Sequence, residues 1–143
     1  MDYKAFVSST FVDLKDHRAH VIGELRKAGF FVDSIEEWIS AAQEPKVLST
    51  SRLDGCGLCV LLVARRRGHV PNGDELSITQ QEVAEAQRRG IDVLPFLLDD
   101  DALWKTEWDE RKKDKLLRQW RAEIKEGKCG TPTPFNHEPD SIH

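Results

Sequence analysis

A run of seven consecutive apolar residues, LCVLLVA at residues 58–64, constrains the fold more than any other feature of the chain. Seven residues are far too few to cross a bilayer. The run is rich in Val and Leu and has turn-forming residues on both sides, a pattern typical of a strand buried on both faces. Because such a strand needs cover on each side, the run predicts a parallel sheet packed between helices.

Strand-like and helix-like segments alternate along the rest of the chain. Four more runs are typical of strands, at residues 3–8, 30–32, 93–98 and, more weakly because of two prolines, 129–135. Helical spacing of apolar residues covers residues 11–28, 77–89 and 112–126, with Gly29 and Gly90 as stop signals. Residues 34–44 are typical of a long loop, and Pro45 can open a weak helix to Leu53. We therefore expect one domain, residues 1–143, with a flavodoxin-like α/β fold, a three-layer sandwich around a mainly parallel five-stranded sheet.

The overall composition excludes several classes of protein. Hydrophobic residues make up 39% and charged residues 32% of the chain, which predicts a packed core and not a disordered chain. The formal net charge of -4 argues against nonspecific binding to nucleic acid. The chain shows no secretory signal and no membrane span, and three cysteines do not form a disulfide framework. A cytoplasmic location is expected, as a whole protein or as a domain of a longer one.

In a parallel sheet, ligands bind beyond the carboxyl ends of the strands, where the strand order reverses. This places a site in three loops, residues 8–10, 34–44 and 65–77. The chain contains neither GxGxxG nor GxxxxGK[ST], so a dinucleotide fingerprint and a P-loop are both missing.

Three features near these loops each allow two interpretations. The hydroxyls of Ser8, Ser9 and Thr10 can hold a phosphate or ribose beside a helix N-terminus, or Thr10 can simply cap the helix in a box with Asp13. The arginines at 65–67, Arg65 first, can clamp a diphosphate or form a solvated basic loop. Arg18 interrupts an apolar helix stripe, so it either reaches water or pairs with Glu36 or Glu37.

Glu82 is the strongest candidate for catalysis. It borders the inward stripe of the helix predicted for 77–89, whereas Glu85 points away from it. A carboxylate in a half-dry cleft can bind ribose hydroxyls, stabilise an oxocarbenium-like centre or act as a nucleophile when an N-glycosidic bond breaks. The alternative is a capping box of Thr79 with Glu82, or the competing box of Ser77 with Gln80.

The cysteines give little support to metal or redox chemistry. Cys56 and Cys59 form a CxxC that leads into a strand, and Cys129 and His137 are the only loose candidates for further zinc ligands. We therefore predict no metal site and no required cofactor.

Three stretches resemble a known family, namely FVSSTFVDLKDHRAHVIGELRKAG (6–29), IEEW (35–38) and CVLLVARRRGHVPNGDELSITQQEVAEAQRRGIDVLPFLLD (59–99). They are similar to family 4062 of domains of unknown function. Its members are usually N-terminal modules fused to NACHT or NB-ARC-type ATPases, WD repeats or tetratricopeptide repeats, and are considered TIR-like. TIR domains place a Ser shortly before a catalytic Glu, as with Ser77 and Glu82 here, and carry a Pro in the next strand, as with Pro95.

The resemblance implies a signalling or effector domain of innate immunity that cleaves an N-glycosidic bond of NAD, as substrate, or of a related nucleotide. Glu82 would be catalytic, and the substrate would contact Ser8, Ser9, Thr10, Glu37, Trp38, Arg65 and Ser77. Oligomerisation through the domain is expected. Two alternatives stay open: a non-catalytic self-association module, and an enzyme similar to the nucleoside deoxyribosyltransferases.

Overall fold

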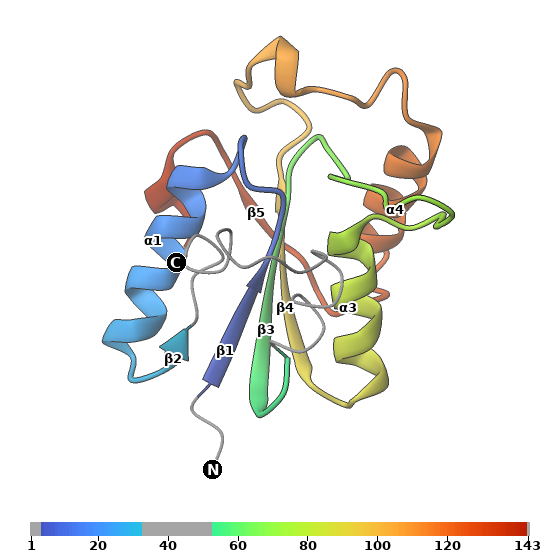
Figure 1. Cartoon of the computed structure of the whole chain (residues 1–143). Helices are drawn as coiled ribbons and strands as arrows, with labels where there is room; N and C mark the ends of the chain where they lie inside the picture. Colours follow the sequence, from blue (N-terminus) through green and yellow to red (C-terminus); the bar gives the residue numbers. More distant parts are fainter. Residues whose placement is uncertain (1–3, 33–52, 143) are drawn as a thin grey trace.

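Parallel strands run through the centre of the molecule in the order β2-β1-β3-β4-β5 (Figure 1). The computed structural model describes residues 4–32 and 53–142. The strands are β1 (Lys4–Ser8), β2 (Phe31–Val32), β3 (Cys56–Val63), β4 (Asp92–Leu98) and β5 (Thr133–Phe135). Every pairing in this sheet is parallel, which confirms the predicted flavodoxin-like α/β fold.

Helices cover both faces of the sheet and complete the predicted three layers (Figure 1). Helix α1 (Lys15–Lys27) lies on one face, and α3 (Ile78–Arg88) and α4 (Lys115–Lys125) lie on the other. The 3₁₀ turn η2 (Thr106–Trp108) follows β4, and the 3₁₀ turn η3 (Pro139–Ser141) follows β5 and packs against α1.

The central strand β3 supplies apolar side chains to both layers, as its continuous apolar sequence predicts. Val60 and Leu62 pack with Val21 and Ile22 of α1. Leu61 and Val63 point to the opposite face, because successive side chains alternate along a strand, and pack near Val83 and Ile124 of the other two helices. The core is therefore two apolar layers that share one sheet.

The N-terminus of α1 differs from its prediction. The helix begins at Lys15, and its N-cap is Leu14, which makes no side-chain capping bond. The Thr10 hydroxyl donates instead to the Asp13 carboxylate, so the prediction that Thr10 caps this helix is wrong. The other end agrees with the sequence: Gly29 follows the helix with φ +98°, a conformation that favours glycine.

Predictions for the second loop lie outside the described residues. These are the loop at 34–44 with Glu37 and Trp38, and the helix opened by Pro45. Within the described part of the chain, no helix is both long and apolar enough to cross a membrane.

The strand order reverses between β1 and β3. From β1 the chain goes to β2 on one side, and it later adds β3 on the other side of β1. Connections from neighbouring strands therefore leave toward opposite faces at this point, and folds of this class usually bind ligands at the carboxyl ends of such strands, here β1 and β3.

Candidate functional site

Ser8 and Glu82 meet at the strand-order reversal. Ser8 is the last residue of β1, and Glu82 lies in the second turn of α3. The Ser8 hydroxyl donates to Glu82 Oε1 over 2.6 Å. Ser8 is fully buried and Glu82 is 4% exposed. A carboxylate and a hydroxyl 74 positions apart in the sequence thus form one buried pair at the expected binding edge.

The capping of α3 leaves the Glu82 side chain available for this contact. The Ser77 hydroxyl accepts from the Gln80 amide at 3.2 Å, and the Gln80 side chain accepts from the Ser77 amide at 2.9 Å. The capping box therefore uses Ser77 and Gln80, and the alternative box of Thr79 with Glu82 is wrong. Since Glu82 is not needed at the helix end, it turns toward the sheet.

The Glu82 carboxylate also lies near β3. Burial, and then the negative charge of Glu82, raise the pKa of the Cys59 thiol well above its usual range. Cys59 is completely buried, so this thiol stays protonated and is a poor nucleophile. Glu82 therefore lies against the sheet between β1 and β3.

Ser9 and Arg18 fix the connection between β1 and α1. The buried Arg18 guanidinium donates to the carbonyl of Val7 at 3.1 Å and to the Ser9 hydroxyl at 2.9 Å. Ser9 in turn donates to the carbonyl of Thr10 at 2.6 Å. Arg18 thus does not reach water as one interpretation proposed, and Glu36 and Glu37 lie outside the described residues.

The loops after β1 and β3 touch at Gly68. A Cβ at this position would lie 2.9 Å from Thr10 Cγ2, closer than real Cβ atoms come to other groups. Gly68 also has φ +92°, which favours glycine. A residue without a side chain is needed here because the two loops that flank the Ser8–Glu82 pair approach so closely.

Arg65 and Arg66 join the loop after β3 to its neighbours. Arg65 is buried and donates to the carbonyls of Asp100 at 2.8 Å and Ala102 at 3.0 Å, beyond the end of β4. Arg66 lies 3.5 Å from Asp13 in the loop after β1 and 3.5 Å from Glu110 near α4.

Arg67 completes this arrangement by joining two helix ends. It donates at 2.9 Å to the carboxylate of Asp114, which is the N-cap of α4. It also donates at 3.2 Å to the side chain of Gln80, which belongs to the capping box of α3. The three arginines therefore tie three loops together, and the interpretation as a solvated basic loop is wrong.

The predicted site residues thus fall into three groups. Ser8 and Glu82 form the buried pair, and Ser9 and Thr10 lie in the adjoining loop. Ser77 and Arg65 are buried in contacts that hold helix and loop backbone. Glu37 and Trp38 lie outside the described residues.

Sequence reasoning missed the buried arginine of α4. Arg121 of α4 donates to the carbonyls of Ala64 and Leu98, the latter at 2.9 Å, and to the Asp100 carboxylate at 2.9 Å. The available signal was its position, one helical turn beyond Leu117 on the buried stripe of α4.

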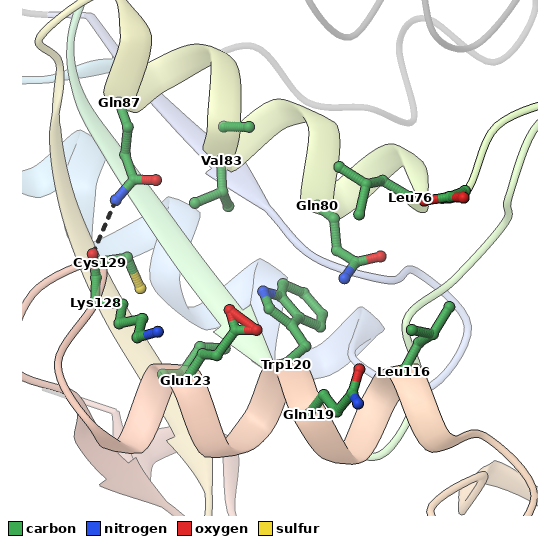
Figure 2. Close-up of a pocket in the computed structure, with 13 residues that line it drawn as sticks. Leu76, Gln80, Val83, Gln87, Leu116, Gln119, Trp120, Glu123, Lys128 and Cys129 are labelled. Atoms are coloured by element: carbon green, nitrogen blue, oxygen red, sulfur yellow. Dashed lines mark hydrogen bonds between the residues drawn. The ribbon is translucent and has the colours of Figure 1, made fainter.

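Ser8 and Glu82 line neither of two cavities that lie elsewhere in the described part of the molecule. The α3–α4 groove, about 280 Å³, runs between the two helices, with Trp120 rising from α4 toward α3 (Figure 2). The Gln87 side chain bonds the carbonyl of Lys128 at one end of the groove. A second cavity of about 690 Å³, the tryptophan cavity, is lined by Val12, His17, Leu103, Trp104 and Trp108, with residues 137 and 139.

Metal-binding groups are not assembled in the part of the chain that the structure describes. No cluster of three or more His, Cys, Asp or Glu side chains there is arranged to hold an ion. Cys56 and Cys59 are buried cysteines of β3, and Cys129 lies beside the α3–α4 groove.

Comparison with known proteins agrees with this architecture. Among curated proteins, none matches the chain. The family described as "Domain of unknown function (DUF4062)" matches residues 4–142, which include every described strand and helix. The chain therefore belongs to this family of domains of unknown function.

Proposed function

We propose that this domain cleaves the N-glycosidic bond of NAD or a related nucleotide, with Glu82 as the catalytic carboxylate. The observation that carries the proposal is the buried Ser8–Glu82 hydrogen bond at the carboxyl ends of β1 and β3. Open α/β sheets bind ligands at this crevice. Carboxylates beside a sugar stabilise the cationic transition state of glycoside cleavage.

The chemistry requires that Glu82 exchange one hydrogen-bond partner. In the structure Ser8 donates to Oε1. A ribose hydroxyl would take this place, and the carboxylate would then face the anomeric carbon. The bond from this carbon to the base nitrogen breaks with its electron pair going to the leaving base, and water adds to the sugar and releases a proton. We propose that Ser9 and Thr10, in the loop beside the pair, contact the ribose or phosphate groups.

An NAD-consumption assay tests the proposal. Wild-type protein, concentrated or fused to an oligomeriser, should release nicotinamide, and Glu82→Gln should lower the rate about 100-fold or more, as expected when a catalytic carboxylate is lost. Glu85→Gln is the matched control, because Glu85 lies on the same helix but pairs with Arg88 and Arg89 outside the site. Equal rates for wild type and Glu82→Gln, or no turnover by wild type, would overturn the proposal.

The substrate class is measured with the same samples. We propose a pyridine nucleotide as substrate, and a panel of free nucleosides followed by chromatography separates this from a nucleoside-processing enzyme. Base exchange on free nucleosides, with NAD left intact, would contradict the proposed NAD cleavage and would favour a nucleoside transferase. Both reactions would need Glu82, so the Glu82→Gln variant serves in each assay.

A second candidate function is self-association without catalysis. The α3–α4 groove favours it, because Leu76 and Leu116 beside this groove remain 44% and 45% exposed (Figure 2). Light scattering on the assay samples distinguishes the two functions. A mass that rises with concentration, together with no nicotinamide release by wild type, would favour the self-association module.

A further inference from the structure

The chain turns back after β5 and lies along α1. We call residues 136–142 the C-terminal strap. His17 of α1 bonds the carbonyl of Asn136 at 3.0 Å, and His20, one turn later, bonds the carbonyl of Ile142 at 2.8 Å. Ile142 is buried in the α1-side core. Two imidazoles and one apolar side chain thus hold this segment to the helix.

The strap also has internal hydrogen bonds that report whether it is closed. The Glu138 amide donates to the Asn136 side chain at 2.8 Å, and the Asn136 amide donates to the Ser141 hydroxyl at 3.0 Å. The Ile142 amide donates to the carbonyl of Pro139 at 3.3 Å. Protection of these amides from hydrogen exchange therefore measures the closed strap.

His17 holds its bond in an environment that disfavours a positive charge. A carbonyl only accepts, so Nε2 of His17 carries a proton and donates it to the Asn136 carbonyl. The ring is 4% exposed and lies between the rings of Trp104 and Phe135, at centroid distances of 5.6 and 5.4 Å. Burial lowers the pKa of His17, more than the bond to Asn136 raises it.

Charged groups near His17 do not reverse the lowering of its pKa by burial. From α1 and the loop before it, Asp16 and Asp13 favour the protonated ring, and His20 opposes it. From the connection after β4, Lys105 lines the same cavity as His17. On the strap itself, His137 and Glu138 form an exposed pair 3.3 Å apart, and Asp140 is exposed. Burial has the largest single effect on the pKa of His17.

We propose that the C-terminal strap is an acid-released latch, closed by neutral His17 and opened when this imidazole takes up a proton from solvent. The closed strap covers His17 with the Asn136 carbonyl and the neighbouring strap residues, whereas the open strap lets the charged ring become hydrated. His137 and Pro139 of the strap also line the tryptophan cavity. Release therefore removes one wall of a cavity at the carboxyl ends of the strands, independently of any chemistry at Glu82.

Hydrogen exchange of the whole chain at pH 7.5 and pH 5.5 tests the latch. Protection factors, which correct for intrinsic exchange, are compared for peptides that cover the strap. The open state should titrate near the ordinary pKa of 6.5, and the closed state lower. Protection of the strap should therefore fall up to about tenfold over this interval, while peptides from β3 stay protected.

Two variants separate the roles of the histidines. His17→Gln keeps a side-chain N–H donor but cannot titrate, so its strap should show little pH dependence. His20→Gln is the matched control on the same helix, and it should keep the pH dependence of the wild type. An NMR titration of the His17 ring in the wild type provides the readout if His17→Gln fails to fold. Strap opening that does not follow that titration, or an unchanged pH dependence in folded His17→Gln, would overturn the proposal.

Discussion

Buried arginines do much of the positioning at the level of single residues. Arg18, Arg65 and Arg121 are each at most 5% exposed, and each donates to backbone carbonyls near the carboxyl end of a strand. A guanidinium has five donors in a fixed plane, so one side chain can satisfy several carbonyls that have no ladder partner. These arginines therefore hold the ends of β1, β3 and β4 at the candidate site.

Removal of one such arginine gives a direct prediction. Arg121→Met should lower the free energy of unfolding by about 2–4 kcal/mol, because the carbonyls of Ala64 and Leu98 lose their donor inside the protein. Arg118→Met, three residues earlier on the exposed side of α4, should change it by less than about 1 kcal/mol. Urea unfolding measures both values. Similar losses in the two variants would show that the buried contacts carry no special weight.

At the level of elements, the loop after β3 sets the spacing of the site. Its three arginines reach the loops after β1 and β4, and Gly68 lets it press against Thr10. The Ser8–Glu82 pair bridges β1 and α3, so this spacing determines whether the two side chains meet.

A glycine series measures this close approach. Gly68→Ala should cost about 2–3 kcal/mol of stability, the sum of a strained positive φ and a clash with Thr10 Cγ2. Gly73→Ala, with φ +85° and open space around it, should show only the cost of strain. Thr10→Ser removes the clashing methyl but keeps the hydroxyl, so it should recover part of the loss in Gly68→Ala. Thermal unfolding of the three single variants and of the double variant Gly68→Ala with Thr10→Ser measures these changes in stability. If the double variant is no more stable than Gly68→Ala, the contact between Gly68 and Thr10 is contradicted.

At the level of the whole molecule, carboxylates beyond the end of β4 make stability depend on pH. Hydrogen bonds from Lys125 and then Arg121 lower the pKa of Asp100, and Arg111 lowers that of Asp109. Both groups bind protons more weakly when folded than their ordinary pKa of 3.8 implies. Their contribution is therefore complete well above pH 3.8 and is lost as the pH falls through the folded pKa values.

Acid unfolding tests this predicted direction of the pH dependence. The stability of the wild type should fall as the pH drops below about 4, and Asp100→Asn with Asp109→Asn should make this fall less steep. Asp92→Asn, at the opposite end of β4, is the control and should keep the wild-type slope. A slope that is unchanged in the double variant would mean that other carboxylates dominate the acid response.

Local patterns determined the elements of this protein because each pattern has a short-range cause. The apolar run at 58–64 lies in β3 and the residue after it, Gly29 and Gly90 follow the ends of their helices, and the parallel sheet followed from alternating strands and helices. The N-termini of the helices were harder to predict from the sequence. The sequence allows Thr10 as a helix cap or as a ligand contact, and its hydroxyl binds Asp13. It also allows two capping boxes on α3, of which the structure forms the box of Ser77 with Gln80.

The sequence by itself determined the family, the sheet and the presence of Ser8 and Glu82 near its carboxyl edge, because periodicity and motif are properties of neighbouring residues. Only the tertiary structure decided that these two residues form a hydrogen bond, that Arg65 donates to carbonyls of the loop after β4, and that His17 binds the C-terminal strap. These contacts join residues 34 to 119 positions apart. Such contacts are set by how strands and helices pack together, which no local pattern of side chains specifies.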